Sequence, residues 1–188
     1  MNDLALHLLD IVQNSLVAGA SFITIEVNEN PAGNLLTISV KDNGRGMTPE
    51  QVQKLSDPFF TSRTTRRVGL GVPLLRQTAE QSGGSLEVVS EPGKGTLLTV
   101  CFQYDHLDRP PLGDVANAVV LMISANPEVG FSYHYAYNDR SYEVNTMELK
   151  EVLGDLPVND LYVICLLYTS DAADDLLCVD LGGRRIIK

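Results

Sequence analysis

Basic residues, cysteines and long apolar runs are all scarce in this sequence of 188 residues. Only 14 Lys and Arg stand against 24 Asp and Glu, which gives a formal net charge of -10. This balance argues against nucleic acid or an anionic membrane as the partner, because both need a basic surface. No apolar run reaches the roughly eighteen residues that a membrane span needs. Three cysteines without metal-ligand spacing argue against a disulfide framework, so we expect a cytoplasmic protein.

The N-terminal stretch is apolar but does not have the pattern of a signal peptide. Asp3 and Asp10 interrupt it, and no basic residue opens it. Its apolar positions recur at helical spacing and Gly19 follows them, which predicts an amphipathic helix over residues 3–19. The whole chain is 44% hydrophobic and 20% charged, the balance of a globular protein with a core.

Three segments of the chain differ in character. Residues 1–104 carry a glycine-rich α/β pattern, and the Pro- and Gly-containing stretch HLDRPPLGD then marks a boundary. Residues 105–164 are predicted to form a small α/β appendage. Within residues 165–188, CLLYTSDAAD and CVDLGGRRIIK resemble, in tandem and in the right order, the translation of adapter DNA from sequencing libraries. We therefore expect this last segment to be adapter read-through, with the natural chain truncated near Ile164.

Helical and strand-like periodicities alternate along the first segment. The predicted order after the first helix is a hairpin over residues 21–42, a short helix at 48–55, a polar loop, a helix at 72–83 and a second hairpin over 85–102. This order predicts an α+β fold, a two-layer α/β sandwich with helices on one face of a sheet. In the second segment we predict an apolar helix at 114–125, a hairpin turning at 138–140 and a short final helix.

Asp10 and Asn14 lie four residues apart on the first predicted helix. They share one face with His7, opposite the Leu and Ile stripe. An acid and an amide so placed can hold a hydrated Mg²⁺ and orient a water, because Mg²⁺ takes few protein oxygens and keeps waters and phosphates. The simpler interpretation of the same pair is a solvated helix face.

Asp42 opens the pattern Asp-Asn-Gly-Arg-Gly directly after a predicted strand. A carboxylate at a strand end can accept a hydrogen bond from an exocyclic amine, while Gly44 and Gly46 let the backbone approach a flat ring. The alternative is an ordinary Asn-Gly turn.

Glycines also precede the helix predicted at 72–83. In VGLGV, residues 68–72, free N–H groups at a helix start can bind phosphate through their geometry and the helix dipole. Arg63, Arg66 and Arg67 stand just upstream, where they either clamp phosphate oxygens or form a solvated basic loop. A last glycine pair, in GKGT at residues 93–96, is by itself consistent with a hairpin turn.

Taken together and in this order, the patterns resemble the ATP-binding domain shared by histidine kinases, DNA gyrase, Hsp90 and MutL. DIVQNSLVAGA is similar to the box whose Asn binds Mg²⁺, and KDNGRGM to the box whose Asp selects adenine. DPFFTSR resembles the aromatic box that opens the ATP lid, and VGLGVPLL and GKGT resemble the two later glycine boxes. The resemblance covers about residues 1–104 and implies the same two-layer fold.

Roles for individual residues follow from this resemblance. It implies that Asp10 is the catalytic base, that Asn14 binds Mg²⁺ and that Asp42 takes the adenine amine. Thr96 would support Asp42, through a water. The remaining ATP-binding positions that the resemblance implies are Gly44, Gly46, Met47, Phe60, Arg63, Gly69, Leu70, Gly71 and Val72.

Departures from the family pattern shape the expected activity. Asp10 stands where gyrase- and MutL-like ATPases have Glu, and the shorter side chain makes in-line activation of water poorer. Val17 replaces an acidic residue of the family, and the lid is short. These points favour slow hydrolysis. We expect a stand-alone, kinase-type module that transfers phosphate in trans to a protein partner or phosphoacceptor, with His106 and His134 as candidate acceptors. The alternatives are a non-catalytic ATP-responsive binding module and a slow MutL- or gyrase-like ATPase.

Overall fold

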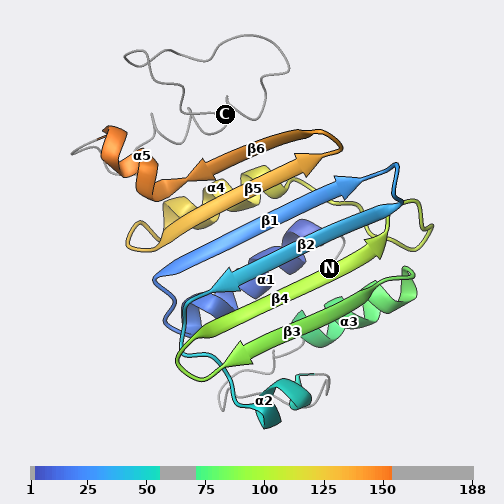
Figure 1. The fold of residues 1–188 in the computed structure, drawn as a ribbon, viewed down its shortest axis with the longest axis horizontal. Coiled ribbons are helices and arrows are strands. Elements are labelled where there is room, and N and C mark those ends of the chain that lie inside the picture. Colours follow the sequence, from blue (N-terminus) through green and yellow to red (C-terminus); the bar gives the residue numbers. More distant parts are fainter. Residues whose placement is uncertain (1–2, 56–70, 154–188) are drawn as a thin grey trace.

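Six strands form one mixed sheet in the computed structural model, which describes residues 3–55 and 71–153 (Figure 1). No helix in these two ranges is both long and apolar enough to cross a bilayer. The elements, in chain order, are α1 (Leu4–Val17), β1 (Phe22–Asn30), β2 (Leu35–Asp42), α2 (Pro49–Lys54), α3 (Gly71–Gln81), β3 (Ser85–Glu91), β4 (Gly95–Gln103), α4 (Val115–Ala125), β5 (Gly130–Tyr137), β6 (Arg140–Asn145) and α5 (Thr146–Leu153).

Side-chain caps precede helices α1 and α2. Asp3 precedes α1 and accepts a hydrogen bond from the Leu6 N–H. Thr48 and Gln51 form a reciprocal capping box at the start of α2, with Pro49 as its first residue. Such caps satisfy N–H groups that the first turn of a helix leaves without partners.

The strands follow the order β3-β4-β2-β1-β5-β6 across the sheet. All neighbours are antiparallel except β1 and β5, which run parallel with Ile23 opposite Phe131. Alternate residues of β1, among them Ile25 and Val27, are fully buried. This period-two pattern places one face of the sheet in the core.

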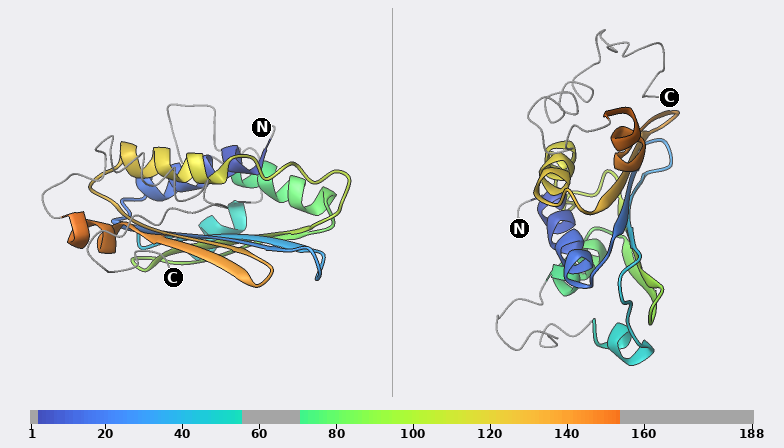
Figure 2. Two further views of the ribbon diagram at one scale, coloured as in Figure 1. Left: turned by 90° about the horizontal axis from the view of Figure 1, so that it is seen from above. Right: turned by 90° about the vertical axis from the view of Figure 1, so that its left-hand side faces the viewer.

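Helices α1, α3 and α4 cover that buried face as a single layer (Figure 2). The arrangement confirms the predicted two-layer α/β sandwich. The residues after the connector extend the same sheet through β5 and β6, and α4 packs beside α1. Val119 and Ile123 of α4 therefore join Leu8 and Val12 of α1 in one continuous core.

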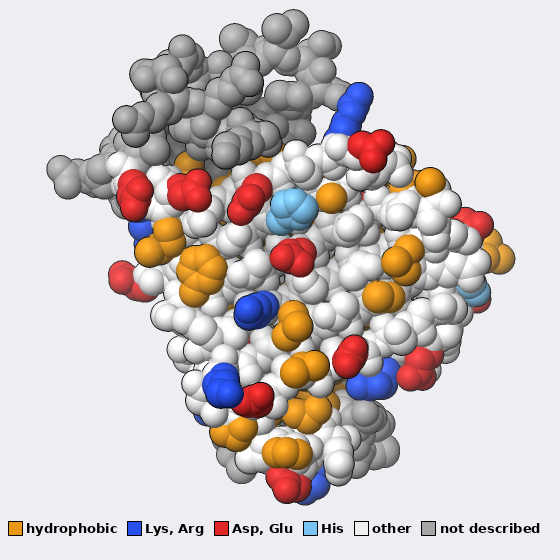
Figure 3. Space-filling view, viewed as in Figure 1, with side chains coloured by type: hydrophobic (Ala, Val, Ile, Leu, Met, Phe, Trp, Pro, Cys, Tyr) orange, Lys and Arg blue, Asp and Glu red, His pale blue; other side chains and the backbone are white. Residues whose placement is uncertain are grey.

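The opposite face of the sheet carries a mixture of acidic, basic and hydrophobic side chains (Figure 3). His134 of β5 lies on this face, opposite Glu26 of β1 and Glu143 of β6 in the strand ladders. Asp42, in contrast, continues the buried side of β2 and faces the helices. The candidate acceptor His134 and the predicted site therefore lie on opposite faces of the sheet.

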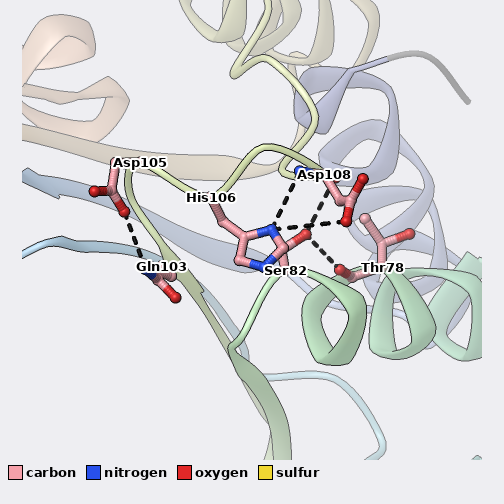
Figure 4. Close-up of polar contacts among 6 residues, drawn as sticks. All are labelled: Thr78, Ser82, Gln103, Asp105, His106 and Asp108. Carbon is pink, nitrogen blue, oxygen red and sulfur yellow. Dashed lines mark hydrogen bonds and ion pairs between the residues drawn. The ribbon is translucent and has the colours of Figure 1, made fainter.

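Hydrogen bonds fix the connector between β4 and α4 to the end of α3 (Figure 4). The buried Ser82 hydroxyl lies 2.8 Å from the Thr78 carbonyl and 3.2 Å from the Asp108 carbonyl. Nδ1 of His106 accepts from the Asp108 N–H at 3.1 Å. The other candidate acceptor, His106, is thus part of the turn that holds the connector in place.

Candidate functional site

The end of β2 holds Asp42 between two hydrogen-bond donors. The Ser15 hydroxyl of α1 donates to Oδ2 at 2.8 Å, and the Gly44 N–H donates to Oδ1 at 2.9 Å. Asp42 is only 7% exposed, so its carboxylate is shielded from bulk water. An ionised carboxylate accepts hydrogen bonds only, and each oxygen has capacity beyond the single donor seen here. The arrangement is suited to a ligand group that donates a hydrogen bond.

The loop after β2 is tied to the turn between α1 and β1. The Asn43 side-chain oxygen accepts from the backbone N–H groups of Ser21 and Phe22, each at 2.9 Å. Its amide donates to the Ser21 hydroxyl. The Arg45 N–H donates to the Ala18 carbonyl at 3.0 Å. These contacts fix the chain on both sides of Gly44, and so they hold the carboxylate of Asp42 in place.

On its other side, the loop packs against the β3–β4 hairpin. Gly46 has a φ of +64°, and a Cβ there would lie 1.9 Å from the Glu91 carbonyl oxygen. Only glycine allows both this conformation and this approach. The next residue, Met47, donates its N–H to the Ser90 hydroxyl at 2.9 Å. The absence of a side chain at Gly46 therefore serves the packing of the loop on the hairpin.

Ser15 and Ser90 contribute hydroxyl groups to this region, and neither was predicted from the sequence. Thr96 is paired with Asp42 in the β2–β4 ladder, and its hydroxyl lies 2.9 Å from that of Ser90. The hydroxyl that reaches Asp42 directly belongs to Ser15, which lies on the buried face of α1. A buried polar group requires a partner, so a serine on a buried helix face was the signal available.

The other predicted residues of α1 meet the start of α3. Asp10 is half-buried and Asn14 is exposed. A Cβ on Gly71, the first residue of α3, would lie 3.1 Å from Oδ2 of Asp10. The Val72 side chain is buried in the core, and its backbone N–H belongs to the first turn of α3. Helix α1 thus carries Asp10 and Asn14 as well as Ser15, which is hydrogen-bonded to Asp42.

His7, which the sequence places on the same helix face as Asp10, is a buried side chain. It is 4% exposed, and both α3 and α4 pack against α1. Its Nδ1 has no hydrogen-bond partner in the described part of the chain. Burial lowers the pKa of His7, while the nearby carboxylates of Asp10 and Asp3 act in the opposite direction. The imidazole is therefore a neutral core group near pH 7.

The side-chain oxygens of Asp10 and Asn14 on α1 suit a Mg²⁺ ion that takes few of its ligands from the protein. In residues 3–55 and 71–153 no group of three or more His, Cys, Asp or Glu side chains is placed to hold a metal. Mg²⁺ accepts such a sparse set, since it keeps waters and phosphate oxygens as ligands. Six predicted site residues, Phe60, Arg63, Arg66, Arg67, Gly69 and Leu70, lie outside the described residues, as does the adapter-like segment 165–188.

The sequence matches the family described as histidine kinase-, DNA gyrase B- and HSP90-like ATPases over residues 2–106. The chain belongs to this family. Its relatives include the sensor histidine kinase ZraS of Klebsiella oxytoca, 36% identical over 94 residues that make up 49% of this chain and 20% of the relative. The non-motile and phage-resistance protein of Caulobacter vibrioides is 32% identical over 111 residues, 54% of this chain and 13% of the relative. The chain therefore spans a fifth or less of these two relatives.

Two solved structures share the fold of this chain. The Aquifex aeolicus MutL ATPase domain, complexed with ADP, superposes with a TM-score of 0.50 at 19% identity, covering 81% of this chain and 69% of that one. The N-terminal domain of a DNA repair protein gives a TM-score of 0.52 at 17% identity, covering 77% and 52%. At these identities the likeness shows the shared architecture alone.

Proposed function

We propose that this chain is a Mg·ATP-binding regulatory protein of the kinase type, which passes the γ-phosphoryl group to a protein partner. The observation that carries the proposal is the buried carboxylate of Asp42, which Ser15 and the Gly44 N–H hold in place and whose remaining lone pairs are available to a donor. The chain's membership of this ATPase family and its similarity to a sensor histidine kinase also support the proposal.

In this proposal the base end of ATP lies at Asp42. The 6-amino group of adenine donates to the carboxylate, and the loop through Gly44, Gly46 and Met47 forms one wall of the adenine pocket. Contacts from Asn43 to Ser21 and from Met47 to Ser90 keep that loop in shape before the nucleotide arrives. A preformed site avoids part of the entropic cost of binding.

The phosphate end lies between α1 and the start of α3. Backbone N–H groups of Gly71 and Val72 belong to the first turn of α3, where N–H groups and the helix dipole favour anions. Asn14 would hold Mg²⁺, which neutralises phosphate charge when it is bound. Asp10, beside Gly71, would accept the proton of the attacking group. Its short side chain makes it a weak activator of water, so phosphoryl transfer to a positioned partner is favoured over hydrolysis.

A second candidate function is an ATP-responsive binding module without turnover. The contact between α1 and α4 favours it, because α1 carries Asp10 and Asn14 while α4 belongs to the segment after the connector. The core residues of both helices form one cluster. A nucleotide that shifts α1 would therefore alter the surface formed by α4, β5 and β6, where a partner would bind.

One experiment separates these functions. The full chain is incubated with Mg·ATP labelled at the γ-phosphate, with Asp42→Asn as the blank and Asp139→Asn, in the exposed β5–β6 turn, as the matched control. Steady release of free phosphate by the wild type would identify an ATPase and contradict the kinase proposal. Retention of bound ATP with little turnover, lost only in Asp42→Asn, is the expected result. Label transferred to an added partner would then exclude the sensor function.

A further inference from the structure

We infer that Ser15 is the positioning residue that makes Asp42 selective for a nucleotide base with an exocyclic amine. This inference rests on the proposed nucleotide-binding function and deepens it. The Ser15 Oγ and the Asp42 Oδ2 lie 2.8 Å apart, and the two residues are 4% and 7% exposed. A hydrogen bond to a charged group in such a shielded place is strong and directional.

The position of the hydroxyl proton follows from the distances. The Ser15 hydroxyl has one hydrogen to donate and two acceptors within reach, Oδ2 of Asp42 at 2.8 Å and the Ile11 carbonyl at 3.5 Å. The first distance is ideal for an O–H···O bond, whereas the second is beyond the usual range. The proton therefore points at the carboxylate, which leaves Asp42 as an acceptor toward any ligand.

Both oxygens of Asp42 are oriented in this way. Oδ1 takes the Gly44 N–H at 2.9 Å and Oδ2 takes the Ser15 hydroxyl, so the carboxylate cannot rotate without breaking one of the two bonds. A 6-amino group supplies the hydrogen that the remaining lone pairs accept. A base with a keto oxygen at that position places an acceptor against an acceptor, and a base with only hydrogen there leaves the buried lone pair unpaired.

The hydroxyl is supplied by a rigid element. Val12 and Ile11 of the same helical turn are buried in the core, and the Ala18 carbonyl at the end of α1 accepts from the Arg45 N–H of the loop. Helix and loop are thus fixed relative to each other. Among the described residues, Ser15 is the only side chain that donates a hydrogen bond to Oδ2 of Asp42.

The test is a cycle that removes the hydroxyl from the protein and the amine from the ligand. Dissociation constants for ADP and for purine riboside 5′-diphosphate, which lacks only the 6-amino group, are measured by calorimetry on the full chain. The variants are Ser15→Ala and the matched control Ser124→Ala, whose partly buried hydroxyl in α4 donates to the Val120 carbonyl one turn earlier. A positioning role predicts that Ser15→Ala weakens ADP binding about tenfold or more, and binding of the amine-free analogue much less.

The outcomes are distinct. A smaller preference for ADP in Ser15→Ala, with Ser124→Ala like the wild type, supports the inference. Equal losses of affinity for both ligands would mean that Ser15 has only a structural role, and unchanged affinity for both would mean that it does not contribute to binding. Either result overturns the inference. If Ser15→Ala does not fold, Ser15→Cys takes its place with the same expectation, because its thiol is a weak donor of similar shape. Unchanged ADP binding by Asp42→Asn would instead overturn the proposed function itself.

Discussion

The Asp10 carboxylate lies directly against Gly71, the first residue of α3: a Cβ on that glycine would sit 3.1 Å from Oδ2 of Asp10. Two motifs about sixty positions apart in the sequence therefore meet at one point, where an acidic side chain faces the N-terminus of a helix. The N–H groups of a helix N-terminus favour anions such as phosphate, and an acid beside them can serve the group that attacks the phosphate.

Gly71→Ala tests whether this contact matters for activity. The added methyl group must push the Asp10 carboxylate by a few tenths of an ångström. The backbone of Gly71 does not have a conformation that requires glycine, so this contact is the main effect of the substitution. We expect the rate of γ-phosphoryl transfer or hydrolysis to fall severalfold while the melting temperature stays the same or rises, because Ala is the better helix former by up to about 1 kcal/mol. An unchanged rate at saturating ATP would show that the position of Asp10 is not critical.

Asn14→Ala tests the Mg²⁺ assignment, with its exposed neighbour Gln13→Ala as the control. ATP affinity is measured with Mg²⁺ and with excess EDTA for each protein. We expect Mg²⁺ to strengthen ATP binding by the wild type and Gln13→Ala, but not by Asn14→Ala, because the amide oxygen is the proposed protein ligand. Undiminished Mg²⁺ dependence in Asn14→Ala would remove Asn14 from the metal site.

Gly46→Ala and Gly93→Ala form a matched pair that isolates one backbone contact. Both glycines have positive φ, at +64° and +77°, so an alanine strains each position by a similar ~1–2 kcal/mol. A Cβ on Gly46 would meet the Glu91 carbonyl at 1.9 Å, whereas one on Gly93 meets nothing within 4 Å. We expect Gly46→Ala to lower the free energy of unfolding by at least about 2 kcal/mol more than Gly93→Ala, and to weaken ADP binding. Equal losses in urea unfolding would contradict this account of the loop.

His7 gives the protein a pH-dependent stability with a definite sign. Its pKa is lowered by burial from the ordinary value of 6.5, so the unfolded chain binds a proton at higher pH than the folded chain does. Stability is then fully present above about pH 6.5 and is lost as the pH falls toward the lowered pKa, by up to ~1.4 kcal/mol per pH unit. Asp3 and Asp10 partly offset this loss.

The measurement is urea unfolding of the wild type and His7→Gln between about pH 5 and pH 7.5. Gln cannot take up the proton, so the difference between the two proteins isolates His7 from the other titrating groups. We expect the wild type to lose more stability than the variant on acidification. Parallel pH profiles would show that the imidazole titrates normally.

Local sequence patterns predicted most of the helices and strands. The alternation of Ile23, Ile25 and Val27 predicts a half-buried strand, and Thr48-Pro49 predicts a helix start; both are confirmed. The helix predicted at 114–125 is observed as Val115–Ala125, and the hairpin around residues 138–140 is present. These signals succeed because the interactions that create them lie within a few residues of one another.

Long-range relationships were not accessible in this way. The parallel pairing of β1 with β5 joins strands that lie far apart in the sequence, with β2, β3, β4 and the connector between them, and nothing in either strand specifies the partner. Ser15 occupies a helical position that reads as part of an apolar stripe, and its function depends on a carboxylate at the end of β2. The burial of His7 is likewise a tertiary feature, because it depends on elements outside α1 that pack against that helix.

The central claim is that Asp42 recognises the adenine of a bound nucleotide, and titration calorimetry of the full chain with Mg·ATP tests it most directly. The comparison uses the wild type, Asp42→Asn and the surface control Asp139→Asn, with Mg·GTP as the competing ligand. We predict that the wild type and Asp139→Asn bind Mg·ATP and reject Mg·GTP, and that Asp42→Asn loses at least ~100-fold in affinity for Mg·ATP, since its amide presents a donor where the carboxylate presented an acceptor. Binding of Mg·ATP by Asp42→Asn with the affinity of the wild type would contradict the account.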